Sequence, residues 1–269
     1  MYFGFKNITV SYGRENILEN VTVDVKKGEI AALVGNNGCG KSSLLKTFSR
    51  SVKPKSGEVV YKDRKISEYG RREIARKIAY LPQFCVIPEG ITVEAYVSYG
   101  RYPYLKFGRG LTQLDKKIVA ESVDAVGLSD ICDRDIRLLS GGERRRAQIA
   151  MALCQKSEIL ILDEPVSHLD VGHQIEILDL IENLKRERGL TVLMVLHELN
   201  LASRYADRMI ILNEKKVHAS GEPHEILTAK NLSEIFGISA EIKTDSKTGT
   251  PYFIPLSARK FSERDWLNK

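Results

Sequence analysis

The sequence lacks the features that would place the protein in a membrane or outside the cell. None of its apolar runs approaches the roughly 20 residues that a membrane-spanning helix needs, and the run over 190–196 is typical of the longest. Its first residues lack the basic and then apolar pattern of a secretory signal peptide. The four cysteines are far apart and include no C-x-x-C pair, so neither a disulfide framework nor a zinc site is indicated. We expect reduced thiols and a location in the cytosol.

The sequence also lacks a strong excess of charge, internal repeats and low-complexity segments. Its 269 residues, 43% hydrophobic and 28% charged, are ordinary for a globular chain of one large domain or two small ones. The formal net charge of +6 is modest. It favours a solvated basic face, which also suits an anionic membrane surface, over a nucleic-acid-binding surface. We expect no nucleic-acid partner.

The most informative segment is Gly35–Ser42, which has the spacing G-x-x-x-x-G-K-[ST] of a phosphate-binding loop. The apolar run 30–34 predicts a buried strand before it, and residues 43–48 predict a helix after it. Glycines in the loop allow main-chain N–H groups to surround an anion at the start of that helix. Lys41 adds a positive charge, and the Ser42 hydroxyl is a ligand that Mg²⁺ accepts. The pattern predicts nucleotide binding, and the alternative is a glycine-rich turn that happens to precede Lys-Ser.

Hydrophobic periodicity predicts an α/β fold around this loop. The predicted elements are antiparallel strands over 21–25 and 58–61, helices over 114–125 and 146–154, and buried strands over 159–162 and 190–196. Strands that alternate with helices imply a mostly parallel sheet with helices on both faces.

We predict a single domain with three parts. A nucleotide-binding core over 1–84 and 158–230 would hold the parallel sheet and an N-terminal antiparallel β subdomain. Residues 85–157 would form an inserted helical lobe. Residues 231–269 would form a C-terminal extension that contains a β-hairpin, because strand-like segments flank a turn at Asp-Ser-Lys-Thr-Gly.

Two adjacent carboxylates, Asp163 and Glu164, follow the buried strand 159–162. In a parallel sheet this is the end at which strands deliver ligand contacts. Asp163 is suited to hold Mg²⁺ through water, and Glu164 is suited to polarise the water that attacks the γ-phosphate. The alternative is an acidic helix cap before Pro165.

A second anion-binding pattern begins at Ser140, where Ser-Gly-Gly-Glu leads into a helix that is expected to open at Arg144. A serine, two flexible residues and unpaired N–H groups at a helix start can hold a phosphate. One chain would then carry two phosphate sites for one nucleotide. We expect the second site to serve a nucleotide held by another copy in a two-fold symmetric dimer. Taken alone, the pattern is also that of an ordinary helix cap.

Over nearly its whole length the chain resembles the ATP-binding subunits of ABC transporters. Six motifs occur in the family's order: the Walker A loop Gly35–Ser42, the Q-loop residue Gln83, the signature Leu139–Glu143, the Walker B strand Ile159–Glu164, the D-loop Ser167–Asp170 and the switch histidine His197. Tyr12 matches the aromatic residue that stacks on adenine, although it could equally pack within a sheet.

The resemblance implies ATP and Mg²⁺ as cofactors and a role for each matched residue. It implies catalytic roles for Glu164, His197 and Gln83, and Mg²⁺ ligation by Ser42, Gln83 and Asp163. The residues implied in ATP binding are Tyr12, Gly35, Asn36, Asn37, Gly38, Cys39, Gly40, Lys41, Ser42, Ser43, Ser140, Gly141, Gly142, Glu143 and Asp170.

The chain departs from the family pattern at three positions. Glu143 replaces the commonest glutamine of the signature, Arg145 stands where a glutamine is frequent, and Val166 replaces a frequent threonine. None of these changes removes a residue assigned to chemistry. Glu143 and Arg145 could shift contacts to the opposing nucleotide.

Several stretches are similar to the importer subgroup for iron(III)-siderophore complexes, haem and vitamin B12. They are Asp170–Glu176, Gly100–Tyr104, Met151–Gln155 and Lys247–Pro255. The resemblance favours an iron(III)-siderophore cargo, with haem and vitamin B12 as alternatives. His168 and His173 do not predict a metal site, because a spacing of five does not place them on one helical face. We expect them to be interface and packing residues.

The resemblance implies an ATPase at the cytoplasmic face of the cell membrane. Its expected partners are a second copy of itself in an ATP-sandwich homodimer, a polytopic membrane permease dimer and, indirectly, an extracytoplasmic solute-binding protein. A soluble ABC ATPase that acts on nucleic acid or the ribosome is a competing class. Those proteins usually carry two ATPase units or a long coiled-coil insertion, whereas this chain has one motif set and no sustained heptads. An exporter half is disfavoured because no membrane span is fused to the core.

Overall fold

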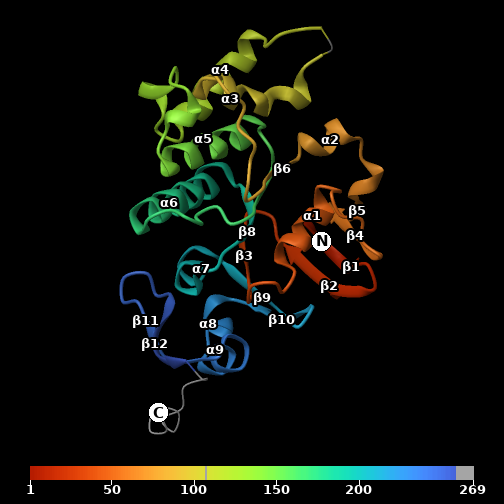
Figure 1. Cartoon of the computed structure of the whole chain (residues 1–269), viewed down its shortest axis with the longest axis vertical. Helices are drawn as coiled ribbons and strands as arrows, with labels where there is room; N and C mark the ends of the chain where they lie inside the picture. The colour runs from red at the N-terminus through yellow and green to blue at the C-terminus, as the bar shows by residue number, and fades with distance from the viewer. Residues whose placement is uncertain (107, 259–269) are drawn as a thin grey trace. The chain divides into compact units, whose positions relative to one another are not determined.

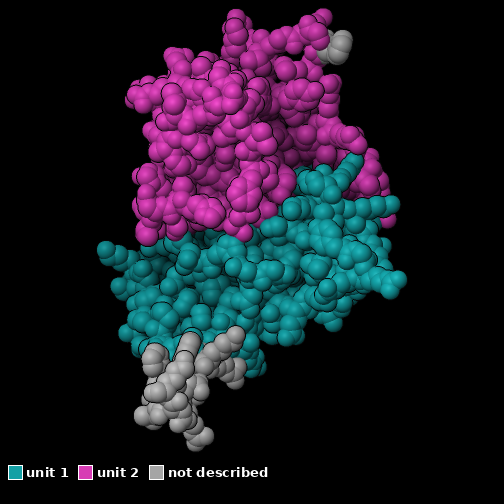
Figure 2. Space-filling model, viewed as in Figure 1, with its two compact units in different colours: residues 1–64, 194–269 teal, residues 65–193 magenta. Residues whose placement is uncertain are grey.

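Residues 1–106 and 108–258, which the computed structural model describes, fold into two units (Figure 2). Unit 1 contains Met1–Arg64 and the chain from Met194 onward, and unit 2 is Lys65–Leu193. The phosphate loop and His197 therefore belong to unit 1. Gln83, the signature and the Asp163-Glu164 pair belong to unit 2.

Unit 1 begins with the antiparallel sheet that the sequence predicts. Its strands are β1 (Phe3–Tyr12), β2 (Glu15–Val25), β4 (Ser56–Tyr61) and the short β5 (Arg64–Lys65), in the order β2-β1-β4-β5. Phe3 of β1 packs edge-to-face against Phe5 and against Phe48, with ring centroids 5.7 and 6.0 Å apart. Phe48 ends α1 (Lys41–Phe48). These contacts pack the helix that follows the phosphate loop against β1.

The phosphate loop follows a buried parallel strand. β3 (Ile30–Val34) pairs in parallel with β9 (Arg208–Asn213), which pairs antiparallel with β10 (Lys216–Gly221). All five residues of β3 are buried. A continuous apolar strand of this kind is typical of a parallel sheet that is covered on both faces.

Helices and a terminal hairpin complete unit 1 (Figure 1). They are α7 (Leu199–Tyr205), α8 (Pro223–Ile226), α9 (Ala229–Phe236), β11 (Ile238–Thr244) and β12 (Pro251–Ala258). Asn200 of α7 accepts from the Phe253 N–H at 2.9 Å and donates to the Phe253 carbonyl at 3.1 Å. Ser203 donates to the Pro251 carbonyl at 2.5 Å. Because a two-stranded hairpin is only marginally stable alone, these bonds to α7 hold it in place.

Unit 2 combines parallel strands with a group of helices (Figure 1). β6 (Ile78–Leu81) and β7 (Ile159–Leu162) pair in parallel with Leu81 opposite Leu162, and the chain returns to unit 1 through β8 (Thr191–Val195). The helices are α2 (Arg71–Ala75), α3 (Val93–Ser98), α4 (Gln113–Asp124), α5 (Gly141–Cys154) and α6 (Val171–Arg188), with 3-10 turns at Ile66–Glu68, Tyr99–Tyr104, Ser129–Ile131 and Ile136–Leu138. The predicted helices over 114–125 and 146–154 are confirmed as α4 and α5. The second begins at Gly141, five residues before the start given by periodicity and three before the start expected from the signature, because Ser140 caps it.

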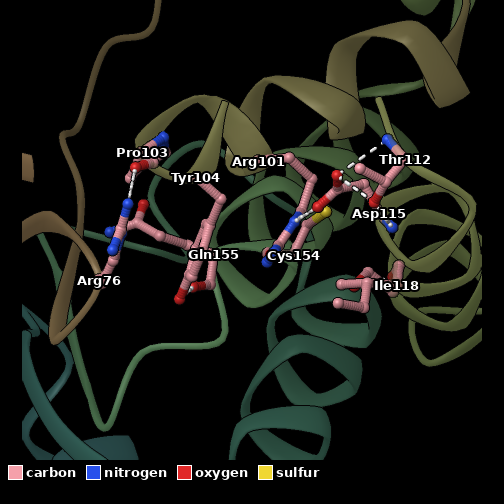
Figure 3. Close-up of polar contacts among 10 residues, drawn as sticks. Arg76, Arg101, Pro103, Tyr104, Thr112, Asp115, Ile118, Cys154 and Gln155 are labelled. Atoms are coloured by element: carbon pink, nitrogen blue, oxygen red, sulfur yellow. Dashed lines mark hydrogen bonds and ion pairs between the residues drawn. The ribbon is translucent and has the colours of Figure 1, made fainter. Parts of the chain in front are cut away.

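A buried polar network joins α4, α5 and the Tyr99–Tyr104 turn (Figure 3). Arg101 donates from Nε to Asp115 Oδ1 at 2.9 Å and from Nη1 to the Cys154 carbonyl at 2.8 Å. Asp115 also caps α4, since its Oδ2 accepts from the Thr112 N–H and hydroxyl. The Thr112 hydroxyl, the Thr112 N–H and Arg101 hold the pKa of Asp115 below its ordinary range despite burial.

Replacing Asp115 by asparagine should destabilise unit 2 by about 3 kcal/mol, because it leaves the Arg101 guanidinium buried without its counter-charge. Chemical denaturation of the purified chain measures this difference. The contribution of Asp115 is fully present above the ordinary aspartate pKa of about 4, and it is lost as pH falls through the lowered pKa.

The matched control is Glu121→Gln on the same helix. Glu121 pairs with Lys156 at 3.2 Å through two largely exposed side chains, so its loss should cost less than about 1 kcal/mol. Equal effects of the two variants would contradict a stabilising role for the Arg101–Asp115 pair.

Candidate nucleotide-binding and hydrolysis residues

The phosphate loop connects β3 to α1 and has the backbone geometry of an anion site. Gly35, Gly38 and Gly40 have φ values of 149°, 79° and 103°, a region that residues with a Cβ rarely adopt. A Cβ on Gly35 would overlap the carbonyl oxygen of Leu212 in β9. The loop therefore needs glycine at this position for its close approach to the neighbouring strand. Helix α1 begins at Lys41, so the main-chain N–H groups of its first turn adjoin the loop.

Lys41 places a cation over the same loop. Its side chain is only 5% exposed, and Nζ donates to the carbonyls of Gly35 at 2.8 Å and Asn36 at 3.0 Å. Carbonyl oxygens hold the ammonium by dipole attraction, and a phosphate oxygen carries more negative charge than either of them. The loop thus combines oriented main-chain donors with a point charge that an anion can attract.

Tyr12 and His197 also lie within unit 1 on exposed positions. The Tyr12 side chain is 51% exposed, and its hydroxyl lies 3.4 Å from the Ser43 hydroxyl at the start of α1. His197 follows β8 and lines a cavity of about 310 Å³ together with Gly35, Asn36 and Asn37. Phe236, Ile238 and Phe253 of the C-terminal segments also line this cavity. Tyr12 therefore lies beside the start of α1, whereas His197 lies beside the first residues of the phosphate loop.

In unit 2, Glu164 is joined to Gln83 although 81 residues separate them. Gln83 Nε2 donates to Glu164 Oε2 at 2.6 Å, and the Ser167 hydroxyl donates to the same oxygen at 2.8 Å. The Glu164 backbone has a φ of 50°, a left-handed conformation that costs free energy in a residue with a Cβ. Two side-chain donors and a constrained backbone thus orient this carboxylate.

Asp163 lies deeper, with only 2% of its surface exposed. Burial, and then the negative charge of Asp163 and a hydrogen bond to it, raise the pKa of Tyr80, which stays a neutral hydroxyl donor near neutral pH. No sequence pattern points to Tyr80, and Ser167 enters only as part of the matched D-loop. Ser167 could have been found from its position three residues after Glu164, whereas Tyr80 becomes a neighbour of Asp163 only because β6 and β7 pair in register.

The signature residues form a complete helix cap. Ser140 Oγ accepts from the Glu143 N–H at 3.2 Å, and Glu143 Oε2 accepts from the Ser140 N–H at 2.8 Å. This reciprocal pair is a capping box, and it holds the pKa of Glu143 below its ordinary range. Glu143, one of the three departures, is therefore engaged by its own helix. Gly141 and Gly142 lie between the two capping residues.

The D-loop aspartate caps the neighbouring helix and orients a histidine. Asp170 Oδ1 accepts from the His173 N–H at 3.0 Å, and Oδ2 lies 2.7 Å from His173 Nδ1. The His173 ring packs against Gly142, where a Cβ would overlap it. His173 is thus a packing residue, as the sequence suggests. In the described part of the chain, no cluster of three or more His, Cys, Asp or Glu side chains could hold a metal ion by itself.

The predicted Mg²⁺ ligands nevertheless have suitable chemistry. Asp163 offers a buried carboxylate, and Ser42 offers a hydroxyl directly after Lys41. Gln83 uses its amide nitrogen toward Glu164, which leaves its carbonyl oxygen as the ligand atom. Protein sites for Mg²⁺ typically combine one or two such oxygens with substrate phosphates and water. The residues present therefore fit a nucleotide-bound Mg²⁺ better than a metal held by protein alone.

A phosphate loop after a buried parallel strand and an acidic pair at the end of another define the class of P-loop nucleotide-binding proteins. Residues 18–167 match the ABC transporter family. The chain belongs to this family, as an ATP-binding subunit. No helix among the described residues is both long and apolar enough to cross a membrane.

Relatives of known identity cover nearly the whole chain. A ferric enterobactin transport ATP-binding protein of Escherichia coli is 41% identical over 93% of both chains. A hemin import ATP-binding protein of Shewanella denitrificans is 35% identical over 92% of this chain and 98% of the relative. A solved metal-chelate type ABC transporter in an inward-facing conformation has a chain that matches with a TM-score of 0.83, 27% identity and coverage of 97% of this chain and 99% of that chain. These matches confirm the predicted ABC ATPase fold and ATP as the ligand.

Proposed function

We propose that this ATPase energises the import of an iron(III)-siderophore complex through a separate membrane permease. The observation that carries the cargo assignment is the 41% identity to a ferric enterobactin transport protein, compared with 35% for the hemin import protein. Both values extend over more than nine-tenths of this chain. Haem is therefore the alternative cargo to be tested directly.

ATP would be held first by its phosphates and its base. The N–H groups at the start of α1 would surround the phosphates. Lys41 Nζ would exchange its contacts with Gly35 and Asn36 for the more negative β- and γ-phosphate oxygens. The exposed ring of Tyr12 offers a face for adenine. Ser42, Gln83 and Asp163 would hold Mg²⁺, which would neutralise negative charge on the phosphates.

Glu164 is proposed as the general base of hydrolysis. The oxygen of an attacking water would form a bond to the γ-phosphorus while the bond to the leaving ADP oxygen breaks, and the carboxylate of Glu164 would accept the water proton. Gln83 and Ser167 donate to Glu164 Oε2, and these two hydrogen bonds orient the carboxylate. His197 would donate a hydrogen bond to the γ-phosphate.

A second copy and a permease are proposed as the partners. The signature residues Ser140 to Gly142 would contact the nucleotide held by the other copy, so that ATP joins two chains and hydrolysis separates them. Phe84 and Val86, which follow Gln83, are 76% and 94% exposed. Exposed apolar side chains beside a proposed catalytic residue suit contact with another protein. We propose that the permease contacts this segment at the cytoplasmic face of the membrane.

The cargo is tested by growth of a strain from which the gene for this chain has been deleted. We expect growth to fail when a ferric siderophore is the sole iron source and to remain normal on haem. The intact gene should restore growth, and a Glu164→Gln gene should not. Failure on haem alone would replace the proposed cargo by haem, and normal growth on every iron source would contradict a role in iron import.

A further inference from the structure

Arg145 is a buried cation at the centre of unit 2. It belongs to the second turn of α5, and only 7% of its surface is exposed. Its guanidinium donates from Nε to the Pro165 carbonyl at 2.8 Å and from Nη1 to Gln148 Oε1 at 2.8 Å. Burial lowers its pKa, while the negative charges of Asp163 and Glu164 oppose this effect. An arginine remains charged under such conditions, so a full positive charge is kept in the interior.

The remaining contacts of Arg145 reach the two chain segments that carry the proposed catalytic side chains. Nη2 donates to the Glu164 carbonyl at 3.2 Å and to the Asp163 carbonyl at 3.3 Å. Nη1 approaches the carbonyl of Pro82, the residue before Gln83, at 3.5 Å. One planar group therefore ties α5 to both segments. Burying a cation costs free energy, even among carbonyl dipoles. An apolar side chain of the same size would not carry this cost.

These contacts surround Glu164, a residue with an unfavourable backbone conformation. Glu164 has a φ of 50°, and its neighbours Asp163 and Pro165 are both held by the same guanidinium. A residue in a left-handed conformation persists only when its surroundings determine it. Rotation of the Glu164 peptide would move the carboxylate away from Gln83 Nε2, which lies at 2.6 Å.

We propose that Arg145 is a positioning residue for ATP hydrolysis. It attaches the main chain at Pro82 and at Glu164 to helix α5 and so keeps Gln83 and Glu164 in contact. The inference rests on the proposed role of Glu164 as the base. A glutamine at position 145 has two N–H donors, whereas arginine has five in a fixed plane. Arginine can therefore hold the Pro82 and Glu164 segments at the same time. Because the Ser140 end of α5 is proposed to serve the other copy's nucleotide, Arg145 also connects the two nucleotide sites of a dimer.

The test compares three substitutions of Arg145 in the purified full-length chain. Arg145→Met keeps the length and removes every donor, Arg145→Gln keeps amide donors without charge, and Arg145→Lys keeps the charge at one point. The matched control is Arg146→Met, because Arg146 is the adjacent arginine, is partly exposed and pairs with the exposed Glu176 at 2.7 Å. The readouts are kcat for ATP, the Kd for a fluorescent ATP analogue and the melting temperature.

We expect Arg145→Met to lower kcat between about 10-fold and 100-fold, because small misplacement of a reacting group has effects of this size. The Kd should stay within about twofold, since Arg145 does not contact the phosphate loop in the proposal. Arg145→Gln should recover part of the lost kcat. Arg146→Met should keep the kcat of the unmodified chain.

Three results would overturn the proposal. The first is a kcat of Arg145→Met within about twofold of the Arg146→Met value. The second is a parallel loss of kcat and nucleotide affinity, which indicates a general structural role. The third is an Arg145→Gln variant no better than Arg145→Met. If Arg145→Met is insoluble, Arg145→Lys decides. One ammonium cannot reach all the acceptors that lie around the edge of the guanidinium, and a normal kcat there contradicts the inference.

The experiment also separates this inference from the proposed base. Normal turnover of Glu164→Gln would remove the role of Glu164 itself. Loss of turnover in Glu164→Gln with normal turnover in Arg145→Met would remove only the positioning role.

Discussion

Replacing Glu164 by glutamine should abolish most ATP hydrolysis while ATP binding remains. The side chain keeps its shape and can still accept hydrogen bonds from Gln83 and Ser167, which lie at 2.6 and 2.8 Å. An amide is not a base, so the step that removes the water proton loses its acceptor. General bases contribute about 10²- to 10⁴-fold, and kcat should fall within this range. Steady-state phosphate release measures it.

The same variant should accumulate as a closed dimer with ATP, because the nucleotide that joins the chains is no longer hydrolysed. Light scattering with and without ATP measures the dimer. The matched control is Glu158→Gln at the other end of β7, where Glu158 pairs with Lys77 at 3.1 Å. Its kcat should be unchanged. Near-normal turnover of Glu164→Gln would refute the assigned base.

Mixing two inactive variants should restore activity if the nucleotide sites are shared between chains. Lys41→Ala removes the phosphate-binding ammonium, and Ser140→Arg blocks the signature. In a mixed dimer, one site carries both defects and the other carries neither. Half of the dimers in a random mixture are mixed, so roughly a quarter of the original rate is expected if each site works independently.

Each variant alone should hydrolyse ATP at background rates, for different reasons. Lys41→Ala should lose affinity for ATP, since Nζ is the buried cation of the loop. Ser140→Arg should keep its own phosphate loop and bind ATP. The control mixes Ser140→Arg with Glu164→Gln in place of Lys41→Ala. The intact nucleotide site in that mixed dimer draws Glu164 from the Ser140→Arg chain and its signature from the other, so activity is again expected. Inactivity of every mixture would count against the shared arrangement.

The secondary structure around the phosphate loop follows from local sequence. Five consecutive apolar residues specify β3, and a glycine-rich turn with Lys41 begins α1. Periodicity predicts helix α4. Its start is also a local feature, because Thr112 and Asp115 form a capping box within four residues. Periodicity puts the start of α5 at residue 146, five residues after the observed start at Gly141. There the capping box at Ser140 outweighs a first turn that contains two glycines, which periodicity alone reads as a loop.

The sequence predicts which residues belong to the candidate site, but not how their side chains contact one another. Motif spacing identified the phosphate loop, Asp163, Glu164 and Gln83, since each motif carries its own mechanism. The contact between Gln83 and Glu164 joins residues 81 positions apart, and that of Tyr80 with Asp163 depends on the register of β6 and β7. Local sequence patterns cannot predict contacts between residues that are this far apart in the chain.

The amino-acid sequence by itself determined the nucleotide chemistry, the order of the elements and the family, because these depend on residues within one loop, strand or helix turn. Only the tertiary structure decided which main-chain carbonyls Arg145 contacts, since these lie 18 to 63 residues away. It likewise showed that the His173 ring packs on Gly142. Burial and hydrogen-bond direction set these roles, and both arise only when distant segments of the chain meet.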